Sequence, residues 1–182
     1  MTVKTPEQAV EHTQASFRDK WRHNASLAMA ATLAENSEIQ HWILSRNGFS
    51  SLDEFAGFLK AKRRILDAGC GNGRVTALLA RHASPTAEIV GIDFSSAPIA
   101  RANLSDYRNV RIEAGDLLGD LEELGLFDFI YCQEVLHHTA DPAKAFDNLA
   151  SRPHSMSRIV AGLGMLASLA TAYHVSPRSS RA

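Results

Sequence analysis

Residues 65–73 read ILDAGCGNG, an apolar run that ends in a carboxylate and continues into three glycines spaced two apart. Glycine is needed where the backbone takes a positive φ or passes close to a ligand, and the N-terminus of a following helix attracts anionic groups. A tight turn without a ligand is the alternative, but three alternating glycines exceed what such a turn requires. The stretch therefore predicts a strand, a turn that binds a small anionic group, and a helix.

Downstream of this stretch, short apolar runs alternate with segments of helical periodicity. The expected strands cover residues 64–67, 88–92, 110–113 and 127–132. The expected helices cover residues 74–82, 97–104 and 143–150, with a short turn near 117–124. Strands separated by helices are typical of βαβ units, which form parallel sheets. The sequence thus predicts an α/β fold with a doubly wound, mainly parallel, Rossmann-like sheet.

Upstream of the stretch, the pattern is helical throughout. A proline at a first helical position begins an expected helix over residues 6–23, a second helix covers 25–46, and a third starts at a capping box over 51–54. We therefore expect three parts, namely an N-terminal helical extension or cap over 1–62, an α/β core over 63–150, and an atypical C-terminal segment with a disordered end over 151–182.

The spacing of the glycines bears on the class of ligand. A dinucleotide fingerprint places a glycine at the sixth position of G-x-G-x-x-G, where this chain has Arg74. This difference weakens the case for a nicotinamide or flavin cofactor but does not exclude one. Asp93 ends the second strand, 20 positions after Gly73, where nucleotide-binding folds place the acid that holds a ribose diol. A solvated loop carboxylate is the alternative for Asp93, and Phe94 fits either the core or a purine face.

Four motifs in this order, over residues 67–73, 91–93, 115–117 and 127–138, resemble the motif set of class I S-adenosylmethionine-dependent methyltransferases. The resemblance covers about residues 64–150 and is far more specific than any one motif. It implies S-adenosylmethionine as cofactor, with the glycine turn around the methionine half. The cofactor-binding residues implied are Asp67, Gly69, Cys70, Gly71, Gly73, Asp93, Phe94, Asp116, Leu117 and Gln133.

The resemblance also implies individual roles. Asp93 would hold the ribose hydroxyls, Asp116 would accept from the adenine amino group beside Leu117, and Gln133 would face the methionine portion. A turn or helix N-cap is the alternative role for Asp116, because Gly-Asp pairs are common in turns.

His137 and Glu134 are the candidates for a catalytic base. Either side chain could take a proton from an acceptor hydroxyl or amine, although the resemblance fixes no such base and packing is the alternative for the histidine. Adjacent residues of a helix or strand point in different directions, so His137 and His138 are not expected to share a metal ion. We expect no metal site.

The C-terminal stretch departs from the family pattern. Residues 151–157 replace the usual Lys-Pro-Gly-Gly turn, and only 158–163 resembles a fifth strand. All 20 acidic residues lie before position 151. We expect a truncated or frame-altered end that lacks the closing strands, or else a tail that docks as a helix. An open edge at the fourth strand would then favour self-association.

Composition limits the partners. A formal net charge of −1 gives no basic field, so neither nucleic acid nor membrane is expected as a partner. Two cysteines and the absence of a secretory pattern at the N-terminus favour a reducing, cytoplasmic setting. The longest uncharged run, 159–175, is too short and too polar for a membrane anchor.

The resemblance implies a methyltransferase that acts on an oxygen, nitrogen or carbon atom of a small molecule. Two alternatives remain, a non-catalytic S-adenosylmethionine-binding remnant and, less favoured, a nicotinamide-dependent oxidoreductase. Phe17, Trp21 and Trp42 are available to line the site or to pack helix against helix.

Overall fold

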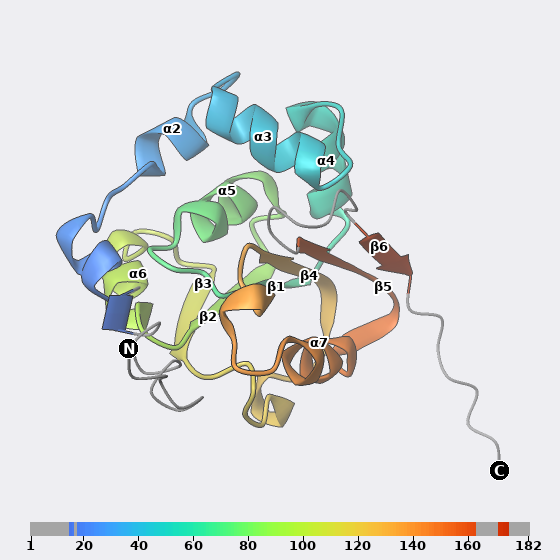
Figure 1. Ribbon diagram of the computed structural model, residues 1–182. Helices are drawn as coiled ribbons and strands as arrows, with labels where there is room; N and C mark the ends of the chain where they lie inside the picture. The colour runs from blue at the N-terminus through green and yellow to red at the C-terminus, as the bar shows by residue number, and fades with distance from the viewer. Residues whose placement is uncertain (1–14, 17, 163–170, 175–182) are drawn as a thin grey trace, which may run out of the picture.

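A single sheet organises the chain. The computed structural model describes residues 15–16, 18–162 and 171–174, and beyond Pro153 it describes the backbone alone. Six strands lie in the order β3-β2-β1-β4-β5-β6 (Figure 1). The strands are β1 (Arg64–Ala68), β2 (Glu88–Asp93), β3 (Val110–Ala114), β4 (Phe127–Gln133), β5 (Pro153–Gly162) and β6 (Thr171–His174). The first five run parallel and β6 runs antiparallel to β5.

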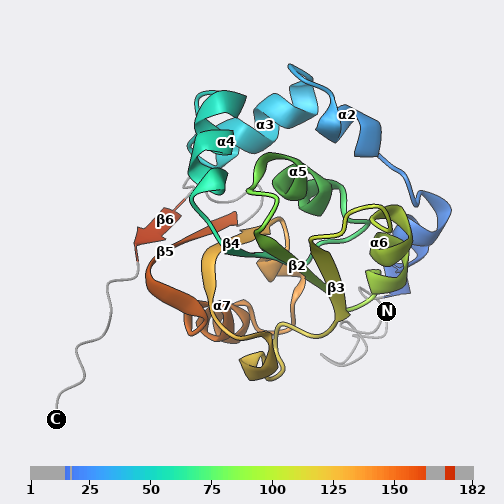
Figure 2. The same cartoon turned by 180° about the vertical axis from the view of Figure 1, so that it is seen from behind.

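Helices cover both faces of the sheet, as Figures 1 and 2 show from opposite sides. They are α2 (Met29–Leu33), α3 (Glu38–Arg46), α4 (Leu52–Lys60), α5 (Arg74–His82), α6 (Ala97–Asn103) and α7 (Pro142–Ala150), with 3₁₀ turns η1 (Glu122–Leu124) and η2 (Leu136–His138). Residues of α3, α4 and α5 form one buried cluster, whereas α7 and η1 contribute to another on the opposite face. The predicted doubly wound α/β fold is therefore confirmed.

Strand β1 shows why its sequence is apolar throughout. Successive side chains of a strand point to opposite faces. Ile65 packs in the cluster beneath α4 and α5, while Leu66 packs in the cluster with α7, and neither is accessible to solvent. A strand covered on both faces carries an uninterrupted apolar run, as parallel strands do.

The expectation that the closing strands are missing was wrong. Strand β5 pairs with β4 from Phe129 opposite Arg158 to Gln133 opposite Gly162, and β6 pairs with β5. This pairing gives the backbone groups of β4 partners on both sides, which an open edge would leave unpaired. Strand β4 is not an edge, so the predicted route to self-association loses its basis. The alternative helical tail and the predicted disordered end lie largely outside the described residues.

The predicted helix over 25–46 is divided in two. Asn36 has a φ of 60°, and the Ser37 hydroxyl accepts a hydrogen bond from the Gln40 backbone N–H, at 3.1 Å between oxygen and nitrogen. A left-handed residue followed by a serine N-cap ends one helix and begins the next. The residues from 18 to 23 are helical, as expected, and lie beside α6 in Figure 1.

Candidate functional site

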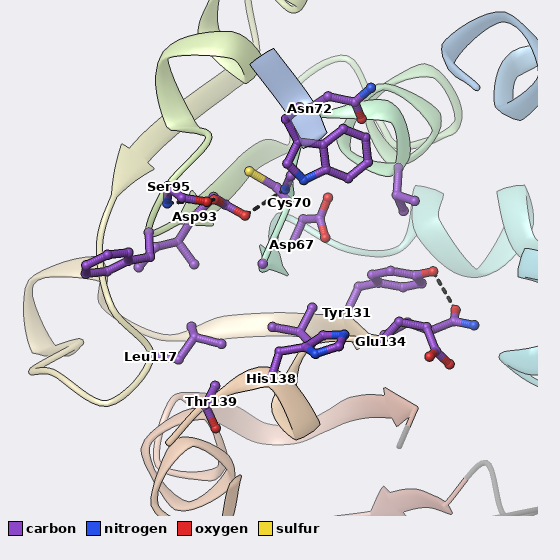
Figure 3. Close-up of a pocket in the computed structure, with 18 of the residues that line it drawn as sticks. Asp67, Cys70, Asn72, Asp93, Ser95, Leu117, Tyr131, Glu134, His138 and Thr139 are labelled. Carbon is purple, nitrogen blue, oxygen red and sulfur yellow. Dashed lines mark hydrogen bonds between the residues drawn. The ribbon is translucent and has the colours of Figure 1, made fainter. Parts of the chain in front are cut away.

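A cavity of about 580 Å³ opens where β1, β2 and β4 end. The neighbours of β1 are β2 on one side and β4 on the other, so the strand order reverses beside β1. Ligands of open α/β sheets bind in the crevice at such a reversal, outside the carboxyl ends of the strands. Figure 3 shows Asp93 and Ser95 toward one end of the cavity and Tyr131 and Glu134 toward the other, with Asp67 between them.

Most of the predicted site residues line this cavity. They are Asp67, Gly69, Cys70, Gly71, Asp93, Phe94, Asp116, Leu117, Gln133 and Glu134. Gly73 and His137 are not among the lining residues, whereas His138 is. Residues that the sequence analysis did not assign to the site also line it, among them Lys20, Asn72, Tyr131 and Thr139. Trp21 and Trp42, left open between lining and packing, are lining residues, whereas Phe17 lies outside the described residues.

Backbone conformation and close packing both require glycine in the glycine turn. Gly71 has a φ of 58°, and a Cβ there would lie 3.1 Å from Cζ2 of Trp21, which covers the turn. Gly73 has a φ of 87° as the N-cap of α5, and a Cβ there would lie 2.6 Å from a methyl carbon of Leu104. Gly73 is therefore required by conformation and packing, away from the cavity wall.

Asp93 joins the glycine turn to the start of α6. Its Oδ2 accepts the Gly71 N–H at 2.9 Å, and its Oδ1 accepts the N–H groups of Ser95 and Ser96 at 2.9 and 2.8 Å. A carboxylate oxygen accepts about two hydrogen bonds. In the part of the chain that the structure describes, Oδ2 accepts one, so it has capacity for a ligand hydroxyl. The alternative of a merely solvated loop carboxylate is wrong.

Asp116 has the turn role that the sequence offered as an alternative, and it also lies on the cavity wall. Its Oδ1 accepts the Leu118 N–H at 2.9 Å, which closes a turn, and the residue also lines the cavity. Phe94 is 49% exposed and forms part of the same wall, so it is not a core residue. This end of the cavity therefore offers an apolar ring beside a carboxylate.

At the other end, hydrogen bonds fix the side chain of Gln133. Its Oε1 accepts from the Tyr131 hydroxyl at 2.6 Å and from Nδ2 of Asn47 at 2.9 Å. Because two donors meet the same oxygen, the amide nitrogen of Gln133 is the group that remains to donate to a ligand. Burial and the nearby Asp67 carboxylate raise the pKa of Tyr131, so its hydroxyl stays protonated.

The expectation that the two adjacent histidines point apart was wrong. Both belong to the 3₁₀ turn η2, and their rings lie 3.9 Å apart between centroids. His137 Nε2 lies 4.0 Å from a carboxylate oxygen of Glu134, while His138 reaches the cavity. Burial, followed by the charges of His137 and Lys20, lowers the pKa of His138 despite the opposing Glu134. Among the described residues, no group of three or more potential ligands could hold a metal ion.

Asp67 is a buried acid between the two ends. Its Oδ2 accepts a hydrogen bond from the Thr76 hydroxyl at 2.6 Å. Burial nevertheless raises the pKa of Asp67 to about 7, with the Thr76 hydrogen bond opposing and the Asp93 charge adding to the shift. At neutral pH the site thus contains a carboxyl group close to its midpoint of ionisation.

We expect stability to depend on this acid. A carboxyl whose pKa is higher in the folded state binds a proton that the unfolded chain has released, so its contribution is present at low pH and is lost as pH rises through about 7. Between pH 5 and pH 8, the unfolding free energy of the Asp67→Asn variant should therefore rise relative to that of the wild type by an amount on the order of 3 kcal/mol. Urea unfolding of both proteins at pH 5 and pH 8 measures this difference.

Two controls make that measurement specific. His82 and His138 have lowered pKa values and act in the opposite sense below their ordinary 6.5, so the difference between wild type and variant is compared. The Thr76→Val variant removes the donor that favours the charged form of Asp67, so its loss of stability should extend to higher pH. An equal difference between Asp67→Asn and wild type at pH 5 and pH 8 would contradict the prediction.

The site can now be set beside known proteins. A family model described as "Methyltransferase domain" matches residues 59–170. An uncharacterized protein of Synechococcus is 46% identical over 94 residues, which cover 49% of this chain and 22% of that protein. The ubiquinone biosynthesis O-methyltransferase of Marinobacter nauticus is 36% identical over 99 residues, which cover 50% of this chain and 40% of that enzyme. The chain thus spans less than half the length of these curated relatives.

Solved structures agree on the fold. The N-methyltransferase NodS of Bradyrhizobium japonicum, in complex with S-adenosylhomocysteine, superposes with a TM-score of 0.58 at 21% identity, covering 87% of this chain and 72% of that one. The plantazolicin methyltransferase BpumL, in complex with a triazolic desmethylPZN analog and S-adenosylhomocysteine, superposes with a TM-score of 0.59 at 20% identity, covering 86% of this chain and 58% of that one. At these identities the likeness concerns the fold. Among the described residues, we find no helix with the length and apolar character that a membrane span requires.

Proposed function

Because the chain belongs to the class I S-adenosylmethionine-dependent methyltransferase family, we propose that it transfers a methyl group from this cofactor to a small-molecule acceptor bound in the same cavity. One observation carries the proposal. A single cavity has Asp93, Asp116 and Phe94 at one end, and its lining also includes Trp21 and His138. A cofactor and an acceptor bound in this cavity would share one space, as group transfer requires.

The residues at the first end fit the cofactor. The free capacity of Asp93 Oδ2 suits a ribose hydroxyl, and the second oxygen of Asp116 suits the adenine amino group, with Phe94 and Leu117 against the ring. Asp67 and the amide nitrogen of Gln133 suit the ammonium and carboxylate of the methionine part. The cofactor, when bound, supplies an electrophilic methyl group on a sulfonium.

The other lining residues suit an aromatic or apolar acceptor with an ionisable group. Trp21 and Trp42 provide flat apolar walls, and His138 and Glu134 are polar groups on the same lining. A neutral imidazole can accept the proton that an acceptor hydroxyl loses on methylation. Relatives named as ubiquinone biosynthesis O-methyltransferases favour oxygen as the methylated atom. His138 thus replaces His137 as our candidate base, and residues 18–62 serve as a cap over the core.

Binding and turnover test this function separately. Calorimetric titration with S-adenosylmethionine and S-adenosylhomocysteine should show micromolar affinity. Formation of S-adenosylhomocysteine should then depend on adding one of a panel of phenols, catechols and amines. Binding without turnover on any acceptor would support the non-catalytic alternative. Binding of NADH without binding of either adenosyl compound would overturn the proposal in favour of an oxidoreductase.

The Asp116→Asn variant should change which base the site accepts. The asparagine oxygen can still accept the Leu118 N–H, but its amide nitrogen would face the adenine amino group, donor against donor. We expect affinity for S-adenosylhomocysteine to fall by about 10-fold or more. S-inosylhomocysteine, which carries a carbonyl oxygen in place of the amino group, should instead bind the variant more tightly than it binds the wild type.

A matched control exists four residues away. Asp120 Oδ1 accepts the Glu122 N–H at 2.7 Å in a similar turn, and Asp120 is not among the lining residues. The Asp120→Asn variant should therefore bind both compounds as the wild type does. Equal affinities of Asp116→Asn and wild type for both compounds would remove Asp116 from the adenine site.

A further inference from the structure

Four hydrogen bonds connect the glycine turn, α6 and the segment that precedes α2 with one another. Nδ2 of Asn72 donates to the backbone oxygens of Ala25 and Leu27, at 3.0 and 3.1 Å. Nδ2 of Asn103 donates to the same Ala25 oxygen at 2.8 Å and to the Asn72 oxygen at 2.9 Å. We call this arrangement, formed by Asn72, Asn103 and the carbonyl of Ala25, the amide clasp.

The hydrogen bonds of the clasp are not needed simply to satisfy the backbone of a surface segment. Backbone carbonyls of surface segments are normally satisfied by water, so Ala25 needs no protein donor. Here two side-chain amides converge on its oxygen, and one of them, Asn72, is fully buried within the glycine turn. A buried amide needs hydrogen-bond partners, and the partners of Asn72 are the backbone oxygens of Ala25 and Leu27.

The clasp adjoins a helix whose side chains line the cavity. Residues 18–23 are helical and end two residues before Ala25. Lys20 and Trp21 of this helix line the cavity, and the indole of Trp21 lies against Gly71. The same turn is held from its other side by Asp93, which accepts the Gly71 N–H. The helix over residues 18–23 (the cap helix) and the Asp93 carboxylate therefore both contact Gly71.

We propose that Asn72 and Asn103 are positioning residues that hold the cap helix on the glycine turn, so that cofactor retention and formation of the acceptor wall depend on each other. The proposal rests on the proposed function. Neither residue touches an acceptor in it; both act through Trp21. A cofactor that orders the turn would stabilise the clasp, and a closed clasp would slow release of the cofactor.

Asn103 is the position at which the clasp can be opened without changing the cavity lining. The Asn103→Asp variant is nearly isosteric, but its carboxylate faces the carbonyl oxygens of Ala25 and Asn72, to which it cannot donate. We expect S-adenosylhomocysteine to dissociate about 10-fold faster and the acceptor KM to rise several-fold. At saturating concentrations of both substrates, kcat should stay within about twofold of the wild type. Stopped-flow displacement and steady-state kinetics measure these quantities.

A double-mutant cycle separates positioning from a general loosening of α6. Asn103→Ala, Trp21→Ala and the double variant are compared by the same dissociation rate. If the clasp acts through Trp21, Asn103→Ala should change the rate less than about twofold in the Trp21→Ala background. Additive effects of the two substitutions would overturn the proposal, as would a wild-type dissociation rate for Asn103→Asp.

Hydrogen exchange keeps the clasp testable if the cofactor assignment fails. Amide exchange over residues 18–27 should be faster in Asn103→Asp than in the wild type, with or without ligand, while exchange in β1 is unchanged. A wild type that binds neither adenosyl compound would refute the proposed function and the coupling, and exchange at 18–27 would still report on the clasp. Unchanged exchange at 18–27 would refute the clasp itself.

Discussion

Replacement of Asp93 by alanine should abolish measurable cofactor binding, with the dissociation constant for S-adenosylhomocysteine rising at least about 100-fold. Two losses combine in this variant. The charged acceptor for a ribose hydroxyl disappears, and hydrogen bonds to a charged group are among the stronger ones. The Gly71 N–H also loses its acceptor at 2.9 Å, which releases the turn that would contact the ligand. Isothermal titration calorimetry measures both enthalpy and affinity.

The structural part of this effect has to be measured separately. Asp93 also accepts N–H groups from Ser95 and Ser96, so the alanine variant should lose stability as well as affinity. The Asp93→Asn variant keeps an oxygen for those two N–H groups and should be closer to the wild type in melting temperature than in affinity. Ser95→Ala, which removes only a hydroxyl 3.4 Å from Oδ1, is the control and should bind normally. A folded Asp93→Ala protein with wild-type affinity would refute the assigned cofactor site.

The parts of the fold that could be predicted are those with local causes. The strand and glycine turn over 65–73 could be predicted because burial on both faces of a strand requires a continuous apolar run, and because positive φ values favour glycine. Ile65 and Leu66 face opposite clusters, and Gly71 needs a left-handed backbone. Asp93 was predicted from its place at the end of a strand, 20 residues after Gly73, whereas Asp116 was implied by the family resemblance, and both residues line the cavity.

The parts that could not be predicted depend on contacts between distant residues. Asn47 and Gln133 share a hydrogen bond across 86 positions, and Asn103 reaches Ala25 across 78. No periodicity signals such a pair. Strand β5 was partly hidden for the same reason, because a pairing with β4 decides whether residues 153–157 are extended. Local geometry was misjudged at η2, where a 3₁₀ turn brings two adjacent rings together.

The turn η2 also contains His138, whose replacement should have a large effect on the rate of methyl transfer. Exchange of His138 for glutamine should lower kcat by about 100-fold at pH 8, because a general base in the transition state commonly contributes this much. The affinity for S-adenosylhomocysteine should remain within about twofold, since glutamine fills similar space at the acceptor end of the cavity. Initial rates at saturating cofactor measure kcat, and the His137→Gln variant is the matched control. The His137 ring packs against that of His138 at a tilt but does not line the cavity, so replacement of His137 should cost much less activity.

The pH profile distinguishes a base from a residue that only shapes the cavity. The pKa of His138 is lowered by burial, so the neutral, proton-accepting form dominates at pH 7, and wild-type kcat should fall only as pH drops below the ordinary value of 6.5. Asp67 lines the same cavity, but the ammonium of a bound cofactor would favour the charged form of this carboxyl, so Asp67 should not add an acid limb near that of His138. The His138→Gln variant should lose the acid limb, and added imidazole should restore part of its rate. A variant that keeps the acid limb would show that another group accepts the proton, and Glu134, on the same cavity wall, would be tested next.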